Sequence, residues 1–169
     1  MEIKIPCKAS YFAWTLLRDR LPTKNNLRRR NMEIIDVTCP FCRSHEEDAS
    51  HLFFSCDRIM LLWWESMSWV NIVGVSSAVP KEHFCRHSFC HINGLRLQRW
   101  QIWWVALIWC IWHHRNRIVF HNEDFKGQKL MEDTIFFLVL AQNLELGFDI
   151  PFHYWSSNMR ESFGFQERV

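Results

Sequence analysis

The chain has 169 residues, of which 49% are hydrophobic and 15% aromatic, a composition that excludes a disordered chain and allows a buried core. The formal net charge is only +2, but it is uneven: residues 1–31 carry a net charge of +6 and residues 32–57 one of −5. An anionic partner would therefore meet its cations in residues 1–31, although a solvated helical face explains the same excess.

The first residues show no basic stretch followed by an apolar one, so we expect no secretory signal. The most apolar run, Ile102 to Trp112, has eleven residues, whereas a membrane-spanning helix needs about 20. The seven cysteines are an odd number, which favours a reducing compartment. We expect an intracellular protein, nuclear or cytoplasmic, without membrane contact.

Helical spacing of apolar residues predicts a first helix over residues 9–21, which Pro22 should end. Thr23 can cap a second, short helix over residues 24–30, in which Leu27 is the single apolar anchor. An extended arm or a short strand should then lead into the cysteine-rich segment.

The stretch "CPFCRSHEEDASHLFFSC" spaces three cysteines and a histidine as C-x2-C-x8-H-x4-C. Thiolate and imidazole are the usual ligands of structural Zn²⁺, which takes four of them in a tetrahedron. The pattern predicts one structural zinc ion bound by Cys39, Cys42, His51 and Cys56. His45 is a rival for the histidine position, and a set of buried free thiols is the alternative to a metal site.

Three further helices are expected after the cysteines. One begins at Asp57, and a long helix over about residues 95–120 is apolar almost all round, so it should be central and buried. A last helix is expected over about residues 128–146. The predicted fold class is mainly α, a small helical domain with one zinc knuckle and a long Trp-rich central helix.

The same reading divides the chain into four parts. Residues 5–72 form the zinc knuckle with its flanking helices, and residues 73–94 are a linker containing Gly, Ser and Pro. Residues 95–148 form a helical hairpin that packs on the knuckle, and residues 149–169 are a loose tail.

A second group of histidines and cysteines falls in the predicted linker: His83, Cys85, His87, Cys90 and His91. Its spacing is too tight for the separated ligand pairs of most zinc sites, so chance enrichment is preferred to a second metal. Cys7 and Cys110 are interpreted as free thiols.

The motifs together resemble the zinc-binding domain at the C-terminal end of plant non-LTR (LINE-type) retrotransposon reverse transcriptases. The family pattern is K-x-x-x-F-x-W, R-L-P-T, L-x-x-R, C-x-x-C, E-x-x-x-H-L-F-x-x-C and a Trp. The matching positions are Lys8, Phe12, Trp14, Arg20, Leu21, Pro22, Thr23, Leu27, Arg30, Cys39, Cys42, Glu47, His51, Leu52, Phe53, Cys56, and Trp63 or Trp64. The later Trp-rich segment, which ends in Arg115 and Asn116, also resembles the segment that follows this domain in such proteins.

The resemblance implies a zinc-binding module that holds RNA or DNA. The cations next to the knuckle are the candidates for phosphate contacts: Lys24, Arg28, Arg29 and Arg30. A sequence pI of about 8.2 is low for a strong nucleic-acid binder, so we expect weak, salt-sensitive binding. Two alternatives stay open: a structural or protein-interaction domain that uses exposed aromatics of its Trp-rich helix, and a decayed fragment without function of its own.

An enzyme is not expected. Such retrotransposon proteins carry an endonuclease and a polymerase, and no paired-aspartate motif of a polymerase occurs in this sequence. A catalytic zinc keeps one coordination position open, whereas the four predicted ligands would close the site.

Overall fold

The computed structural model describes residues 6–69, 77–85 and 94–146. Their helices are α1 (Cys7–Leu17), α2 (Lys24–Arg29), the π-helical turn η1 (His51–Ser55), α3 (Asp57–Trp69), α4 (Pro80–Cys85), α5 (Leu95–His121) and α6 (Gly127–Leu146). Within these ranges there is no strand, only an isolated antiparallel bridge between Thr38 and Glu46. The mainly helical fold class is confirmed, and none of the described helices is long and apolar enough to cross a membrane.

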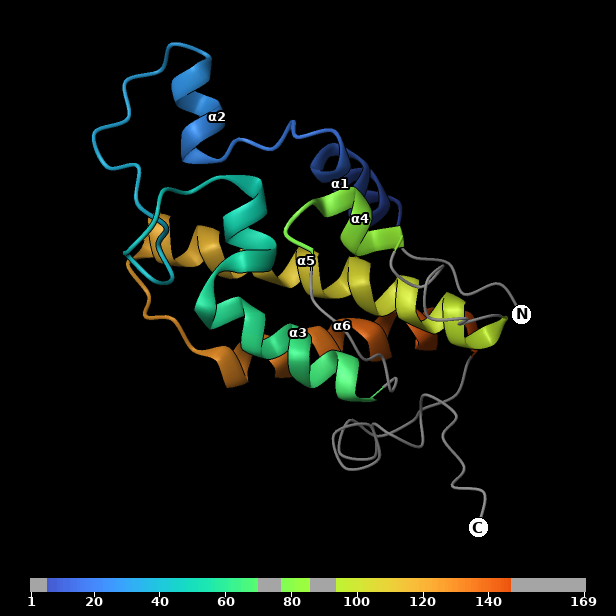
Figure 1. Ribbon diagram of the computed structural model, residues 1–169. Coiled ribbons are helices and arrows are strands. Elements are labelled where there is room, and N and C mark those ends of the chain that lie inside the picture. The colour runs from blue at the N-terminus through green and yellow to red at the C-terminus, as the bar shows by residue number, and fades with distance from the viewer. Residues whose placement is uncertain (1–5, 70–76, 86–93, 147–169) are drawn as a thin grey trace.

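The long helix α5 forms the centre of the fold (Figure 1). Trp100, Trp103 and Trp104 are buried in it, as expected for a helix that is apolar almost all round. It ends at Asn122, whose left-handed backbone (φ 57°) closes the last turn. Helix α6 packs along α5 on one side and α1 packs on the other, with α2 beyond α1 (Figure 1).

Helix α1 is shorter than predicted, and helix α2 lies within one residue of its predicted bounds. Helix α1 ends at Leu17, four residues before the expected end, because the chain turns through a left-handed residue at Asp19 (φ 50°). Thr23 caps α2 as predicted: its side-chain oxygen accepts a hydrogen bond from the backbone N–H of Asn26 at 3.3 Å.

Helix α3 begins at Asp57, as predicted, and follows η1 directly. Its Trp63 is fully buried and donates from Nε1 to the carbonyl of Phe53 in η1 at 2.7 Å, which fixes the helix against the turn. Helix α4 lies within residues 73–94, the predicted linker, and buries His83. The domain boundaries remain a prediction, and the predicted tail, residues 149–169, lies outside the described residues.

Candidate metal site and its link to the long helix

Cys39 and Cys42 are held in a tight turn. The Cys39 N–H donates to the carbonyl of His45 at 2.7 Å, and the Arg43 N–H donates to the carbonyl of Cys39 at 2.9 Å. Arg43 has a left-handed backbone (φ 57°), which lets the chain reverse immediately after the second cysteine. The bridge between Thr38 and Glu46 closes the base of this turn, so both sulfur atoms come from one small rigid loop.

His51 and Cys56 are the first residue of η1 and the residue that caps it. In an α-helix, residues five apart lie about 140° apart around the axis, too far round to share an ion. Here the Cys56 N–H donates to the carbonyl of His51 at 2.9 Å, the i to i+5 bond of a π turn. The wider turn brings the side chains of His51 and Cys56 to the same side of the turn, where both can reach one ion.

The loop and the π turn bring together the four predicted ligands. The ligand atoms of Cys39, Cys42, His51 and Cys56 all lie within 4.8 Å of one another, and Cys42 Sγ is 3.2 Å from His51 Nε2. Metal–ligand bonds of about 2.0–2.3 Å separate tetrahedral ligand atoms by roughly 3.5–3.8 Å, so this cluster fits one zinc ion after small side-chain shifts. Cys39 and Cys56 are fully buried, which excludes water from that side of the site.

The rival histidine does not join this group. His45 is exposed, and its Nδ1 lies 4.0 Å from Cys42 Sγ, whereas His51 approaches the same sulfur more closely and is buried. Of the second histidine and cysteine group, only His83 and Cys85 are described, and the rest lies outside the described residues. His83 Nδ1 accepts a hydrogen bond from Trp104 Nε1 at 3.0 Å, which is the behaviour of a core histidine.

The protonation of the cluster suits metal binding. The Cys39 thiol donates to the Cys56 sulfur, which raises the pKa of Cys39, with burial adding to the effect, and lowers the pKa of Cys56. Burial lowers the pKa of His51, so its imidazole is neutral and can donate its lone pair. Zinc binding would displace the protons of the thiol ligands, so metal affinity should fall as pH falls.

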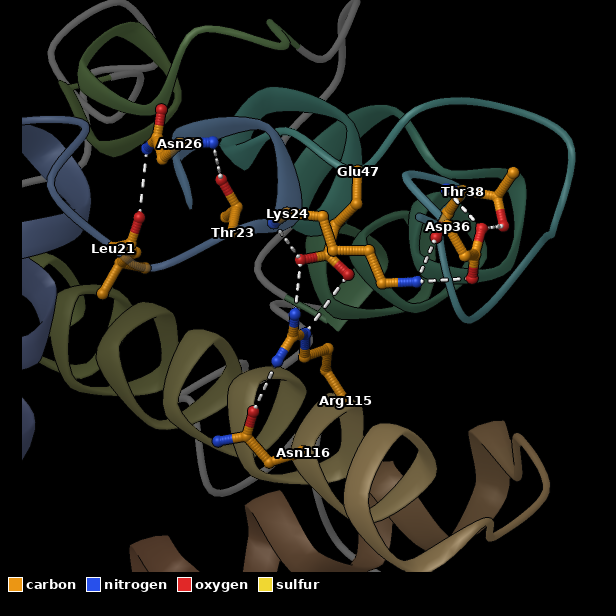
Figure 2. Close-up of polar contacts among 9 residues, drawn as sticks. All are labelled: Leu21, Thr23, Lys24, Asn26, Asp36, Thr38, Glu47, Arg115 and Asn116. Carbon is orange, nitrogen blue, oxygen red and sulfur yellow. Dashed lines mark hydrogen bonds and ion pairs between the residues drawn. The ribbon is translucent and has the colours of Figure 1, made fainter. Parts of the chain in front are cut away.

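A buried ion pair connects this segment to the long helix. Glu47, between the two ligand pairs, accepts hydrogen bonds from Arg115 of α5 at 2.8 Å (Nη2 to Oε1) and 3.2 Å (Nε to Oε2). The Glu47 side chain is 0% exposed and the Arg115 side chain 5% exposed. Oε1 of Glu47 also accepts the backbone N–H of Lys24 at 3.0 Å, so one carboxylate joins the start of α2, the metal loop and α5 (Figure 2).

Arg115 is itself fixed on both sides. Its Nη1 donates to Oδ1 of Asn116 at 3.0 Å, and its guanidinium lies over the Trp112 ring at 4.9 Å from the centroid (Figure 2 shows the Asn116 contact). The sequence marked Glu47, Arg115 and Asn116 only as positions of the resemblance and gave them no role. Their pairing is invisible to local spacing because 68 residues separate the two charged groups.

The four predicted phosphate-binding cations fall into two pairs. Lys24 is only 12% exposed, and its Nζ contacts Asp36 at 2.8 Å and the carbonyl of Thr38 at 2.9 Å (Figure 2). Arg28 pairs with Glu46 at 3.1 Å. These two cations are thus neutralised by the acidic segment that surrounds the metal loop.

The other pair lies at the far end of α2. Arg30 donates to the backbone carbonyl of Arg20 at 3.1 Å, and no carboxylate within the described residues pairs with it. Arg29 contacts Asp19 at 3.3 Å and is largely exposed. Both therefore extend toward the end of α1 and away from the metal loop.

The comparisons with known proteins agree with this site. The family described as zinc-binding in reverse transcriptase matches residues 2–63, a range that contains all four clustered ligands and Glu47. No polymerase or endonuclease family was found in the chain. No curated protein and no solved structure matched it significantly.

Proposed function

We propose that this chain, whose residues 2–63 match the reverse-transcriptase zinc-binding family, is a non-catalytic nucleic-acid-binding module stabilised by one zinc ion. The observation that carries the proposal is the convergence of four soft ligand atoms within 4.8 Å inside the matched segment. Its origin in a plant LINE-type retrotransposon belongs to the same proposal and rests on the motifs of the sequence.

The zinc ion would have a structural role. Cys39, Cys42, His51 and Cys56 supply four protein ligands, which leaves no open position for a substrate or an activated water. Zinc would connect the loop to the π turn, and Glu47 would carry that order to α5 through Arg115. Binding free energy in such a small loop is largely folding free energy.

The nucleic-acid role is supported by the excess positive charge of residues 1–31, most of which lie in the matched segment. Lys24, Arg28 and Arg29 each pair with a carboxylate, whereas Arg30 contacts a backbone carbonyl. We therefore assign a phosphate contact to Arg30 first and to Arg29, the most exposed of the paired cations, second. Contacts of this kind are electrostatic, independent of sequence and weakened by salt. The −5 charge of residues 32–57 keeps phosphate away from the metal loop and directs it toward α1 and the end of α2.

Zinc content tests the first half of the proposal. Elemental mass spectrometry of the purified chain should find one zinc ion per protein, and Cys39→Ser should lose it. Cys110→Ser is the matched control, because Cys110 is a buried thiol of α5 outside the cluster. A folded chain without zinc, or full zinc content in Cys39→Ser, would refute the metal assignment.

Salt-dependent binding tests the second half. RNA and DNA titrations at two salt concentrations should show weaker binding at high salt, and a double variant Arg29→Ala/Arg30→Ala should flatten the salt slope by about one to two ions released. Arg28→Ala should change the slope less than Arg30→Ala, since Glu46 already pairs with the Arg28 guanidinium. Equal slopes in wild type and the double variant would remove the phosphate-contact assignment.

The rival protein-interaction reading depended on exposed tryptophans of the long helix. Trp100, Trp103 and Trp104 of α5 are buried. The half-buried Trp109 and Trp112 pack against Phe12 of α1, so all five rings of α5 are used within the described fold. We therefore give the nucleic-acid reading preference.

A further inference from the structure

We propose that the solvent-facing side of α1, formed by Tyr11, Trp14 and Arg18, is a stacking surface for unpaired bases of single-stranded nucleic acid. The inference rests on the proposed function and makes it more specific, because it names the surface and the strandedness of the partner. We refer to these three residues as the α1 aromatic face.

The α1 aromatic face is a ladder of planar groups. The Tyr11 and Trp14 rings stack on each other with centroids 5.7 Å apart and planes 27° apart. The Arg18 guanidinium lies over Trp14 at 4.8 Å from the ring centroid. Residues 11, 14 and 18 share one side of the helix, so the three planes follow one another along its axis.

These rings do not serve the core of the described fold. Tyr11 is 66% exposed and Trp14 is 42% exposed, whereas Phe12 on the opposite side of α1 is buried. Phe12 packs against Trp109 and Trp112 of α5, at centroid distances of 5.5 Å and 5.9 Å. Helix α1 is thus anchored by one aromatic side and presents a second one to solvent.

The charge next to the face is complementary to a phosphate backbone. The buried Asn26 side chain donates to Asp19 and to the carbonyl of Leu21, which holds the end of α1 against α2. Arg29 and Arg30 consequently contact Asp19 and Arg20, directly beyond Arg18. Three guanidinium groups therefore lie at this end of the face: Arg18 over Trp14, Arg29 beside Asp19, and Arg30 beside the backbone of Arg20.

This combination fits a single strand and not a duplex. Aromatic rings beside a cationic track bind single strands because each unpaired base offers a flat surface for stacking. In a duplex the bases already stack on one another, and only their edges and the phosphates are accessible. The duplex would keep the arginine contacts but would lose the contribution of Tyr11 and Trp14.

The test compares binding of defined oligonucleotides to the full chain. Fluorescence anisotropy would measure the dissociation constants of labelled oligonucleotides. The single-stranded probes are oligouridylate and oligothymidylate of about 16 nucleotides, which is within the site sizes of single-strand binders. The double-stranded probe is an oligoadenylate–oligouridylate duplex of the same length. The variants are Tyr11→Ala, Trp14→Ala and the conservative Trp14→Phe. Trp64→Ala is the matched control, because Trp64 is a 52% exposed tryptophan on α3.

We expect Tyr11→Ala and Trp14→Ala each to weaken single-strand binding about tenfold, the loss of one base stack. Trp14→Phe should recover part of the affinity, while Trp64→Ala and all duplex affinities should change little. Unchanged melting temperatures would show that the alanine variants fold. Oligouridylate tests RNA and oligothymidylate tests DNA, and tight binding of either single strand supports the inference.

Three results would overturn it. If wild type binds oligonucleotides but Tyr11→Ala and Trp14→Ala behave like Trp64→Ala, the α1 aromatic face is not the stacking surface, although the proposed function stands. If wild type binds none of the probes at low salt, both proposals fail. If Trp14→Ala abolishes self-association in sedimentation and leaves oligonucleotide binding intact, the face contacts a second copy of the chain.

Discussion

Glu47 lies in the sequence between the Cys39–Cys42 pair and the His51–Cys56 pair, yet its carboxylate contacts Arg115 of α5. It is fully buried, accepts two hydrogen bonds from Arg115 and a third from the backbone of Lys24. A buried carboxylate with three donors is satisfied, but removing its charge leaves the guanidinium uncompensated. The neighbouring Glu46 makes an exposed pair with Arg28 and offers a comparison at the adjacent position.

The first prediction uses this comparison. Glu47→Gln, which keeps an acceptor oxygen but removes the charge, should lower the free energy of unfolding by about 3–5 kcal/mol in urea titrations. Glu46→Gln should lower it by less than about 1 kcal/mol, because an exposed ion pair is screened by water. Adding Arg115→Met to Glu47→Gln should recover part of the loss. Equal urea midpoints for Glu47→Gln and Glu46→Gln would show that the buried ion pair contributes no more to the free energy of unfolding than the exposed one.

His114 is a second buried polar residue of α5, and its environment favours the neutral ring. Its Nε2 accepts the backbone N–H of Lys126 at 3.2 Å, and its Nδ1 lies 3.0 Å from Arg117 Nη2. Burial, followed by the Arg117 charge, lowers the pKa of His114 below its ordinary value of 6.5. The other charged groups that act on it are Asp133, Glu123 and Lys129.

The second prediction follows from that pKa. As pH falls below about 6.5, the unfolded chain takes up a proton at His114 before the folded chain does, so the free energy of unfolding decreases. His113, whose pKa is also lowered by burial, adds to this slope. His114→Gln should flatten the fall of melting temperature between pH 7 and pH 5, whatever its stability at pH 7. An identical slope in the variant would contradict the assignment.

At the scale of elements, α2 depends on its cap. A helix of six residues, Lys24–Arg29, is too short to be stable by propensity alone. The buried Thr23 side chain satisfies one of its free N–H groups, that of Asn26. The same Asn26 holds the end of α1, so the cap also positions Arg29 and Arg30.

The third prediction concerns this cap. Thr23→Ala should lower the free energy of unfolding by about 1–2 kcal/mol, measured by urea titration, because a cap hydrogen bond is lost at a buried site. Thr23→Ser keeps the hydroxyl and should lie close to wild type. A serine variant as unstable as the alanine variant would show that the methyl group matters and the cap does not.

The bounds of the helices show which parts of the fold sequence patterns can predict. A segment that is apolar almost all round predicted a helix over about residues 95–120, and the structure has α5 at Leu95–His121. The end of α1 was wrong by four residues, since no apolar pattern reports the left-handed turn at Asp19. The π turn of η1 was also beyond prediction, as H-x4-C permits either a short helix or a loop.

At the scale of the molecule, the metal cluster is coupled to helical packing. The π turn continues into α3, and Phe53 of this turn lies 6.3 Å from Trp112 of α5 and 6.2 Å from Phe12 of α1 (centroid distances). The Glu47–Arg115 pair is a second connection to α5. Loss of the ion should therefore loosen the N-terminal part more than the pairing of α5 with α6.

The fourth prediction is the effect of chelation. Removal of zinc should lower the melting temperature by about 10 °C or more, because a ligand that binds only the folded state stabilises it. Hydrogen exchange should accelerate in residues 36–56 while the centre of α5 stays protected. Cys39→Ser treated with the same chelator is the control and should not change further. A melting temperature unaffected by chelation in wild type would exclude a structural metal.

Features that depend on local spacing could be predicted from the sequence: the helical class, the long buried helix, and three cysteines and a histidine close enough along the chain to meet. Covalent neighbours share one backbone geometry, so their pattern carries this information. Long-range packing, which spacing does not report, sets which charges meet: Glu47 pairs with Arg115, and Arg30 contacts a backbone carbonyl. Those outcomes depend on contacts between distant segments, and folding alone brings such segments together.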